Sequence, residues 1–115
     1  MRILSHFRGS LIAAGCFALM IAGPKMFGQK AGDAEKGKDV FESNCSVCHN
    51  ADSEEKKMGP GLKGLFKHDK LHNGKKPNDA NVRAIINAGG GGMPAYGDML
   101  SDEEKDNVIA YLKTL

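Results

Sequence analysis

Residues 45–49, Cys-Ser-Val-Cys-His, constrain this 115-residue chain more than any other stretch. Two thiols three positions apart, followed directly by an imidazole, are the attachment signature of a c-type haem. On one helical turn or in a tight loop, the sulfurs of Cys45 and Cys48 can reach two vinyl groups on one edge of a porphyrin and become thioethers. His49 then lies under the ring, where its imidazole can ligate the iron as the proximal ligand. The motif therefore predicts one covalently bound haem.

Two other interpretations of these cysteines stay open. A thioredoxin-like dithiol also uses two cysteines at this spacing, but within a βαβ unit, and it leaves His49 unexplained. A zinc site could combine Cys45 and Cys48 with His68 and His72, although the 19 residues between Cys48 and His68 exceed the usual gap. The last residue of the motif favours haem over both.

The composition predicts one small domain with a thin core. Hydrophobic residues make up 41% of the chain, aromatic residues only 6%, and there is no Trp. Domains of this kind often need a metal or cofactor to be stable, and a buried haem would supply apolar surface. Of the 16 Lys and Arg residues, three precede residue 29, which leaves 13 against 14 Asp and Glu. No basic stripe is present, so nucleic-acid binding has no support.

Residues 1–28 predict an export segment. Arg2 and Arg8 form a positive start, and residues 11–23 are a run of apolar and small residues with the length of a signal-peptide core. The run is shorter than the ~20 apolar residues that a membrane span needs, but an uncleaved anchor remains open. We expect an exported, periplasmic protein, tethered to the outer face of the cytoplasmic membrane only if this segment is uncleaved.

After a short polar linker at residues 29–32, two helices are expected at the two ends of the domain. Asp33 can cap a helix that runs into Cys45, with Gly37 allowing close approach of another helix and Phe41 filling the space beside that contact. Ser101 and Glu104 form the capping box of the last helix. Its apolar stripe comprises Val108, Tyr111, Leu112 and Leu115, and the Gly37 and Phe41 face is its expected partner.

The loops between these helices hold the second candidate ligand. Residues 59–66 alternate turn formers with large apolar residues, and the carbonyl of Pro60 is free to accept a hydrogen bond from a liganding histidine. A further helix, capped by Asn78 or Asp79, presents an apolar face of Val82, Ile85 and Ile86 and stops at the glycines 89–92. Pro94 then restricts Met93 to an extended conformation, so its thioether could be the sixth iron ligand. Met58, Met99, His68 and His72 are weaker candidates for that position.

Together these motifs resemble the class I (monohaem) c-type cytochromes over about residues 33–115. The residues that carry the resemblance are Gly37 and Phe41, residues 45–49, residues 59–62, residues 92–96 and Tyr111. The resemblance implies an all-α fold in which the N- and C-terminal helices cross around one covalently bound haem. By similarity, Cys45, Cys48, His49, Pro60, Leu62 and Met93 bind the haem c, with His49 and Met93 as the axial ligands of its iron. Many relatives have an Arg near a haem propionate where this chain has Lys67, so the propionate partner is left unassigned.

The resemblance implies a one-electron carrier rather than an enzyme, because two strong axial ligands leave no open position on the iron. Such a carrier would dock transiently with redox partners such as a dehydrogenase, a cytochrome complex or a terminal oxidase. Two alternatives remain: a haem subunit held on a larger dehydrogenase or oxidase complex, and a ligand-binding haem sensor or peroxidase if Met93 dissociates readily.

Overall fold

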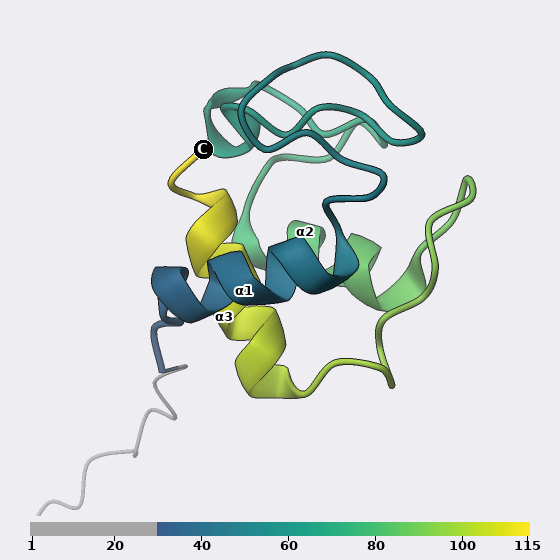
Figure 1. The fold of residues 1–115 in the computed structure, drawn as a ribbon. Helices are drawn as coiled ribbons and strands as arrows, with labels where there is room; N and C mark the ends of the chain where they lie inside the picture. The colour runs from purple at the N-terminus through teal and green to yellow at the C-terminus, as the bar shows by residue number, and fades with distance from the viewer. Residues whose placement is uncertain (1–29) are drawn as a thin grey trace, which may run out of the picture.

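A computed structural model describes residues 30–115 of the chain, with three α-helices and one short 3₁₀ helix joined by long loops (Figure 1). The helices are α1 (Ala34–Asn44), η1 (Leu65–Lys67), α2 (Asp79–Ala88) and α3 (Asp102–Leu112). Within the described part, no strand forms, and one isolated bridge joins Gly90 to Met93. The prediction of an all-α fold is confirmed. The predicted signal peptide or anchor at residues 1–28 lies outside the described residues.

Each helix begins where its capping residue predicts. The side chain of Asp33 accepts hydrogen bonds from two backbone N–H groups in the first turn of α1. At α2 the sequence allowed Asn78 or Asp79 as the cap, and the structure shows that Asn78 takes this position. The capping box of Ser101 and Glu104 is formed at α3. Local hydrogen-bonding chemistry therefore sets the start of each of the three α-helices.

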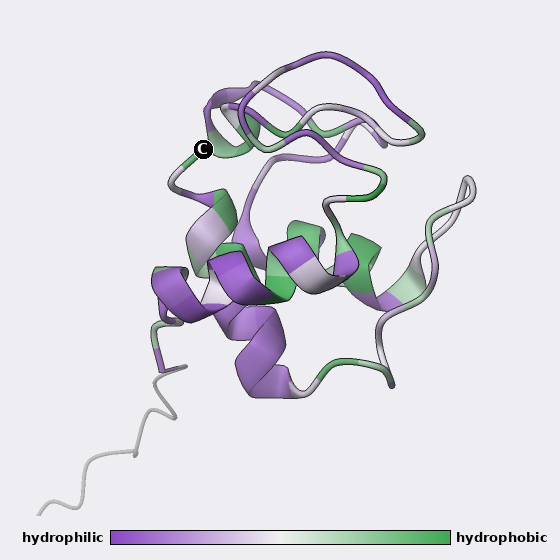
Figure 2. Ribbon diagram, in the orientation of Figure 1, coloured by the Kyte–Doolittle hydropathy of each residue, from purple (hydrophilic) through white to green (hydrophobic). Residues whose placement is uncertain are grey.

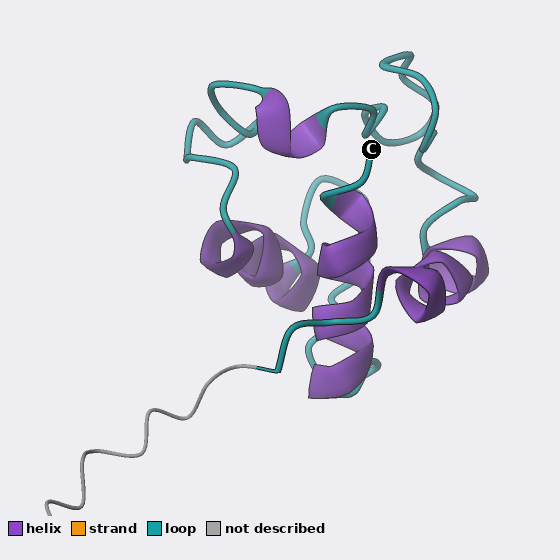
Figure 3. Cartoon of the chain, turned by 90° about the vertical axis from the view of Figure 1, so that its left-hand side faces the viewer, coloured by secondary structure: helices purple, strands orange, loops and turns teal. Residues whose placement is uncertain are grey.

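The first and last helices cross in close contact (Figures 1 and 3), as the sequence predicted. Gly37 is buried, and a Cβ atom placed there would overlap the backbone carbonyl of Asn107 and lie 2.9 Å from Cβ of Tyr111. The ring of Phe41 packs against that of Tyr111 with centroids 5.4 Å apart. The Asn107 side chain also accepts a 2.8 Å hydrogen bond from the N–H of Asp33. A glycine is thus required where the two backbones meet.

Replacing Gly37 with valine is expected to destabilise the folded protein by about 3 kcal/mol, at the upper end of overpacking costs. The added side chain has to push α1 away from the backbone of α3. Guanidinium unfolding of the holo-protein measures the change. The matched control is Ser43→Val, which places the same side chain on an exposed position of α1. Equal stabilities for the two variants would contradict the close approach at Gly37.

The core gathers residues from all three α-helices, and α3 contributes two faces to it. Val108 and Leu112 are buried as predicted, whereas Tyr111 and Leu115 are only partly buried. Ile109, absent from the predicted stripe, is buried because α3 contacts α2 as well as α1. Figure 2 shows mostly hydrophilic residues at the start of α3 and hydrophobic patches on α2. None of the helices within residues 30–115 combines the length and the apolar character needed to cross a membrane.

Candidate haem site

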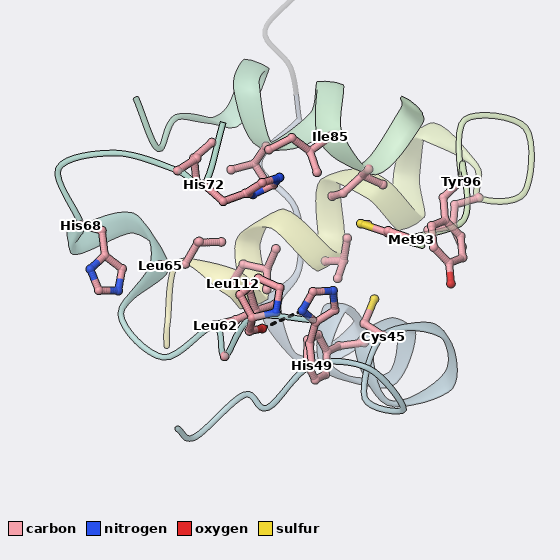
Figure 4. Close-up of a pocket in the computed structure, with 18 of the residues that line it drawn as sticks. Cys45, His49, Leu62, Leu65, His68, His72, Ile85, Met93, Tyr96 and Leu112 are labelled. Atoms are coloured by element: carbon pink, nitrogen blue, oxygen red, sulfur yellow. Dashed lines mark hydrogen bonds between the residues drawn. The ribbon is translucent and has the colours of Figure 1, made fainter. Parts of the chain in front are cut away.

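An apolar cavity of about 320 Å³ lies among the helices and the loops that join them (Figure 4). Core side chains of all three α-helices line it, and they are Phe41, Val82, Ile86, Val108 and Leu112. A second hollow, of about 660 Å³, shares several lining residues with the first, among them Cys45, His49 and Met93. The two hollows therefore form neighbouring parts of one site in the centre of the domain.

The cysteine motif reaches this site because it continues directly from the end of α1. The N–H of Cys45 donates to the carbonyl of Phe41 at 2.7 Å, and the N–H of His49 donates to the carbonyl of Cys45 at 2.9 Å. The chain thus turns once more after the helix, and this turn places both Cys45 and His49 on the wall of the cavity. Cys48 lines only the second hollow.

The orientation of His49 is set by the loop opposite. Its Nδ1 atom lies 2.7 Å from the carbonyl oxygen of Pro60. Since a carbonyl only accepts hydrogen bonds, Nδ1 carries the proton and Nε2 keeps its lone pair for another partner. A Cβ atom at Gly59 would come within 2.8 Å of Nδ1, so the loop can approach the ring this closely only with a glycine there. This arrangement leaves Nε2 as the ring atom that could bind a metal.

Met93 enters the site on the loop after α2. The four glycines before it all have positive φ, at 62°, 118°, 61° and 93°, a conformation that other residues rarely adopt. The N–H of Gly90 donates to the carbonyl of Met93 at 2.9 Å and closes this turn. Figure 4 shows the Met93 thioether pointing into the cavity, from a different loop than His49. The glycine run therefore presents a soft sulfur donor to the same space as the imidazole.

Tyr96 attaches the Met93 loop to the rest of the domain. Its hydroxyl donates to the backbone carbonyl of Asn44 at 2.8 Å, and its N–H donates to the carbonyl of Ile86 at 2.9 Å. The side chain is buried, and burial, with a smaller effect of the nearby thiols of Cys45 and Cys48, raises the pKa of the phenol above its ordinary value. Tyr96 thus joins the loop that carries Met93 to the ends of two helices.

The variant Tyr96→Phe is expected to lose about 1–3 kcal/mol of stability, because the carbonyl of Asn44 loses its hydrogen-bond donor. Chemical unfolding of the holo-protein measures the loss. Tyr111→Phe is the matched control, since no hydrogen bond from its hydroxyl is formed within residues 30–115. A loss for Tyr111→Phe as large as that for Tyr96→Phe would contradict this role for the Tyr96 hydroxyl.

The two thiols and Leu62 complete the predicted set. Cys45 and Cys48 are half-buried and unpaired, as attachment to a cofactor requires. Burial, and to a lesser degree the neighbouring Cys48 thiol, raises the pKa of Cys45 to about 11, so the free thiol stays protonated at neutral pH. Leu62 lines the first cavity, and its N–H donates to the carbonyl of Asn50 at 2.8 Å. All six residues predicted for the site line one or both of the hollows.

The weaker candidates do not gather in the same way. Met99 is 64% exposed and lines neither hollow, and Met58 is 69% exposed at the edge of the second. His68 lines the first cavity, but its Nε2 lies 3.6 Å from a carboxylate oxygen of Glu54. In the described part of the chain, no three His, Cys, Asp or Glu side chains come together as metal ligands. The zinc site of Cys45, Cys48, His68 and His72 is therefore not assembled, and no strand supports the dithiol interpretation.

Two features of this site could not be placed from the sequence, although His72 was named there as a candidate ligand. His72 lies in a polar loop without periodicity, yet it lines both hollows. The hydrogen bond from Tyr96 to Asn44 joins residues 52 positions apart. Neither feature has a local sequence signal, because each depends on how the loops fold back over the helices.

The residues present fit a haem c. Apolar side chains dominate the walls, and neither hollow is lined by an Asp or Glu residue of the described chain. Two thiols stand beside an imidazole whose Nδ1 is held by Pro60, and a thioether reaches the cavity from another loop. An apolar, flat cofactor with an iron atom that accepts nitrogen and sulfur ligands matches this donor set.

Comparison with known proteins gives a family model, described as cytochrome C oxidase, cbb3-type, subunit III, that matches residues 32–112. The chain is 36% identical to cytochrome c6 of Rippkaea orientalis (strain PCC 8801 / RF-1) over 96 residues, which is 84% of this chain and 79% of that protein. It is 44% identical to cytochrome c6 of Bryopsis maxima over 85 residues, or 70% of this chain and 90% of the relative.

A solved structure is also similar. The crystal structure of cytochrome c6 from the diatom Phaeodactylum tricornutum superposes with a TM-score of 0.58 at 30% sequence identity. The match covers 72% of this chain and 93% of the diatom protein. The similarity therefore extends over nearly the whole of the relative and over the part of this chain that holds the cavity.

Proposed function

Because this chain belongs to the class I c-type cytochromes, which carry one covalently bound haem c, we propose that it is an electron carrier whose iron is held by His49 and Met93. One observation supports this ligand pair above others. The imidazole of His49, with its Nε2 free, and the thioether of Met93 reach the same apolar cavity from different loops. A nitrogen and a sulfur ligand would then occupy both axial positions of the iron.

Each residue of the site has a distinct role in holding the cofactor. Cys45 and Cys48 would provide the two thioether links, and Leu62 an apolar contact. The carbonyl of Pro60 holds the His49 ring in one orientation and one tautomer. When bound, the haem supplies an iron that gains or loses one electron without a change of ligands. With both axial positions filled by the protein, no position remains for a substrate, so the chain is a carrier and not an enzyme.

The surroundings of the site favour the reduced state. The walls are largely apolar, and such an environment disfavours the additional positive charge of oxidised iron. A thioether ligand acts in the same direction and raises the reduction potential. The protein would therefore accept electrons from a donor of lower potential and pass them to an acceptor of higher potential.

The proposed contact surface for redox partners lies around the cysteine motif. Val47 is 72% exposed between the two cysteines, and Met58 is exposed at the edge of the second hollow. We expect a dehydrogenase, a cytochrome complex or a terminal oxidase to dock there briefly through a small interface, typical of transient electron-transfer pairs. Stable copurification with a dehydrogenase or oxidase would instead favour the alternative of a permanent haem subunit.

Expression of the full chain in a bacterial host that matures c-type haem tests the proposal. We expect haem that stays with the polypeptide after denaturation, and a pyridine haemochrome spectrum typical of two thioether links. A ferric protein with the long-wavelength absorption band of methionine ligation would support the His49 and Met93 pair. A protein without covalent haem would overturn the proposal, and binding of CO to the ferrous protein would favour the sensor or peroxidase alternative.

The location outside the cytoplasm rests on residues 1–28 and is proposed from the sequence. We expect the intact mass of the mature protein to equal that of a chain beginning near residue 29 plus one haem. An uncleaved anchor would give the mass of the full chain and retain the protein in the membrane fraction. A full-length chain recovered from the cytoplasm would contradict export.

A further inference from the structure

The haem also has an anionic end that the residues described so far leave without partners. Two propionate carboxylates stand on the edge of the porphyrin opposite the vinyl groups that receive the cysteine sulfurs. Carboxylates that face an apolar cavity need cationic partners, because an unpaired charge in such surroundings is costly. The inference that follows therefore rests on the haem of the proposed function.

Few basic side chains line the two hollows, and the contacts that each already makes can be compared. His68, Lys70 and His72 line the first cavity, together with His49. Lys56 and His72 line the second hollow. No carboxylate of residues 30–115 faces either hollow. The described walls thus carry basic side chains and no acidic side chain.

These basic side chains differ in whether they already have a partner in the protein. His68 is already engaged, since Nε2 lies 3.3 Å from the carbonyl oxygen of Lys63 and 3.6 Å from the carboxylate of Glu54. Lys56 makes no such contact with another described residue, but it lines only the second hollow, where Cys48 also lies. Lys70 and His72 have no ion pair and no side-chain hydrogen bond to any other described residue. Both are therefore available to an anionic ligand.

The position of these two residues matches the propionate end. Cys48 lines only the second hollow, whereas Lys70 lines only the first, so the two residues mark different ends of the site. His72 and Cys45 lie on opposite sides of the pocket in Figure 4. Lys67, the last residue of η1, lines neither hollow. The loop before α2 thus places the side chains of Lys70 and His72 on the side of the site away from the attachment cysteines.

We propose that Lys70 and His72 bind the two haem propionates. The lysine contributes a permanent charge, whereas an imidazole changes its charge between about pH 5 and 8. The other ionisable groups that face the two hollows are His49, His68, Lys56, Cys45, Cys48 and Tyr96. Once the haem is attached the two cysteines are thioethers, and His49 is an iron ligand, so His72 is the group free to couple proton uptake to reduction.

The sign of this coupling follows from charge. Reduction adds one negative charge to the haem, with the electron coming from a redox mediator, and this favours uptake of a proton from solvent by His72. The reduced form is therefore favoured as the pH falls from 8 to 5. Removing the imidazole should lower the ratio of reduced to oxidised protein about threefold to tenfold at acidic pH and fixed solution potential. Removing the imidazole should also reduce the dependence of the reduction potential on pH.

Spectroscopic redox titration of the holo-protein from pH 5 to 8 tests the proposal on a set of matched variants. His72→Gln should hold the potential near the alkaline value of the wild type at every pH. His72→Arg keeps a permanent charge and should hold it near the acidic value. Lys70→Gln should lower the potential with the pH step retained. Lys75→Gln is the control, because this exposed lysine of the same loop lines neither hollow.

The outcomes separate this inference from the proposed function. Pyridine haemochrome spectra first establish that each variant carries haem; a wild type without haem would overturn the proposed function itself. A haem-loaded His72→Gln protein with the wild-type pH profile would overturn the inference alone, as would an equal effect of His68→Gln. Nuclear Overhauser contacts between the His72 ring and the propionate methylenes would support it, independently of the potential.

Discussion

Met93→Ala is expected to abolish the long-wavelength band of the ferric protein and to lower its reduction potential sharply. In haem proteins, the choice of axial ligands changes the reduction potential over a range of roughly 0.8 V. Loss of the thioether ligand is therefore expected to change the potential strongly. The variant also leaves one axial position of the iron to water or an added ligand. We therefore expect the ferrous variant to bind CO, while its haem remains covalently attached through Cys45 and Cys48.

The structure offers a close control for this experiment. Met99 lies a few residues further along the chain, but it is 64% exposed and lines neither hollow. Met99→Ala should keep the band, the potential and the resistance to CO. If Met93→Ala retained the methionine band, Met93 would not be the ligand. If Met99→Ala lost it instead, the assignment of the sulfur would have to move to that residue.

The double variant Cys45→Ala, Cys48→Ala is expected to yield no stably folded protein. The apolar cavity lies among the core residues of all three α-helices, and without the two proposed thioether links only His49 and Met93 would hold the cofactor, which can then dissociate and leave the cavity empty. A small domain with a thin core has a total stability of only about 5–15 kcal/mol, so an unfilled centre is enough to unfold it. Circular dichroism should show little helix and no cooperative thermal transition.

The single variants test how far one thioether link is enough to retain the haem. Either Cys45→Ala or Cys48→Ala leaves one thioether link, which should retain the haem but shift the pyridine haemochrome toward that of a single remaining vinyl group. A double variant that is folded without haem, with the helix content of the wild type, would show that the three helices form a sufficient core alone. That result would contradict the dependence of the fold on its cofactor.

Features that depend on neighbouring residues could be predicted from the sequence. The caps at Asp33 and Ser101, the stop of α2 at Gly89 and the close approach at Gly37 all follow from short patterns. The motif at residues 45–49 is also a short pattern, and the haem attachment that its spacing predicts stays a prediction. These are also the features in which one residue type has a clear physical advantage.

Features that depend on the path of a long loop could not be predicted in this way. The burial of Ile109 required knowing that α2 also packs on α3. His72 sits in a polar loop, and its place on the wall of the site emerges only when that loop folds over the cavity. Interactions of this kind join residues that are far apart in the sequence, and no periodic pattern in the sequence indicates them.

The crossing of the first and last helices also has a consequence for the order of folding. The hydrogen bond from Asp33 to Asn107 joins residues 74 positions apart, and the contact at Gly37 has a similar span. Contacts of such high order close late, because the entropy of a long loop must be lost before they form. The cysteine motif, which directly follows α1, is therefore expected to stay accessible on an open chain until these contacts form.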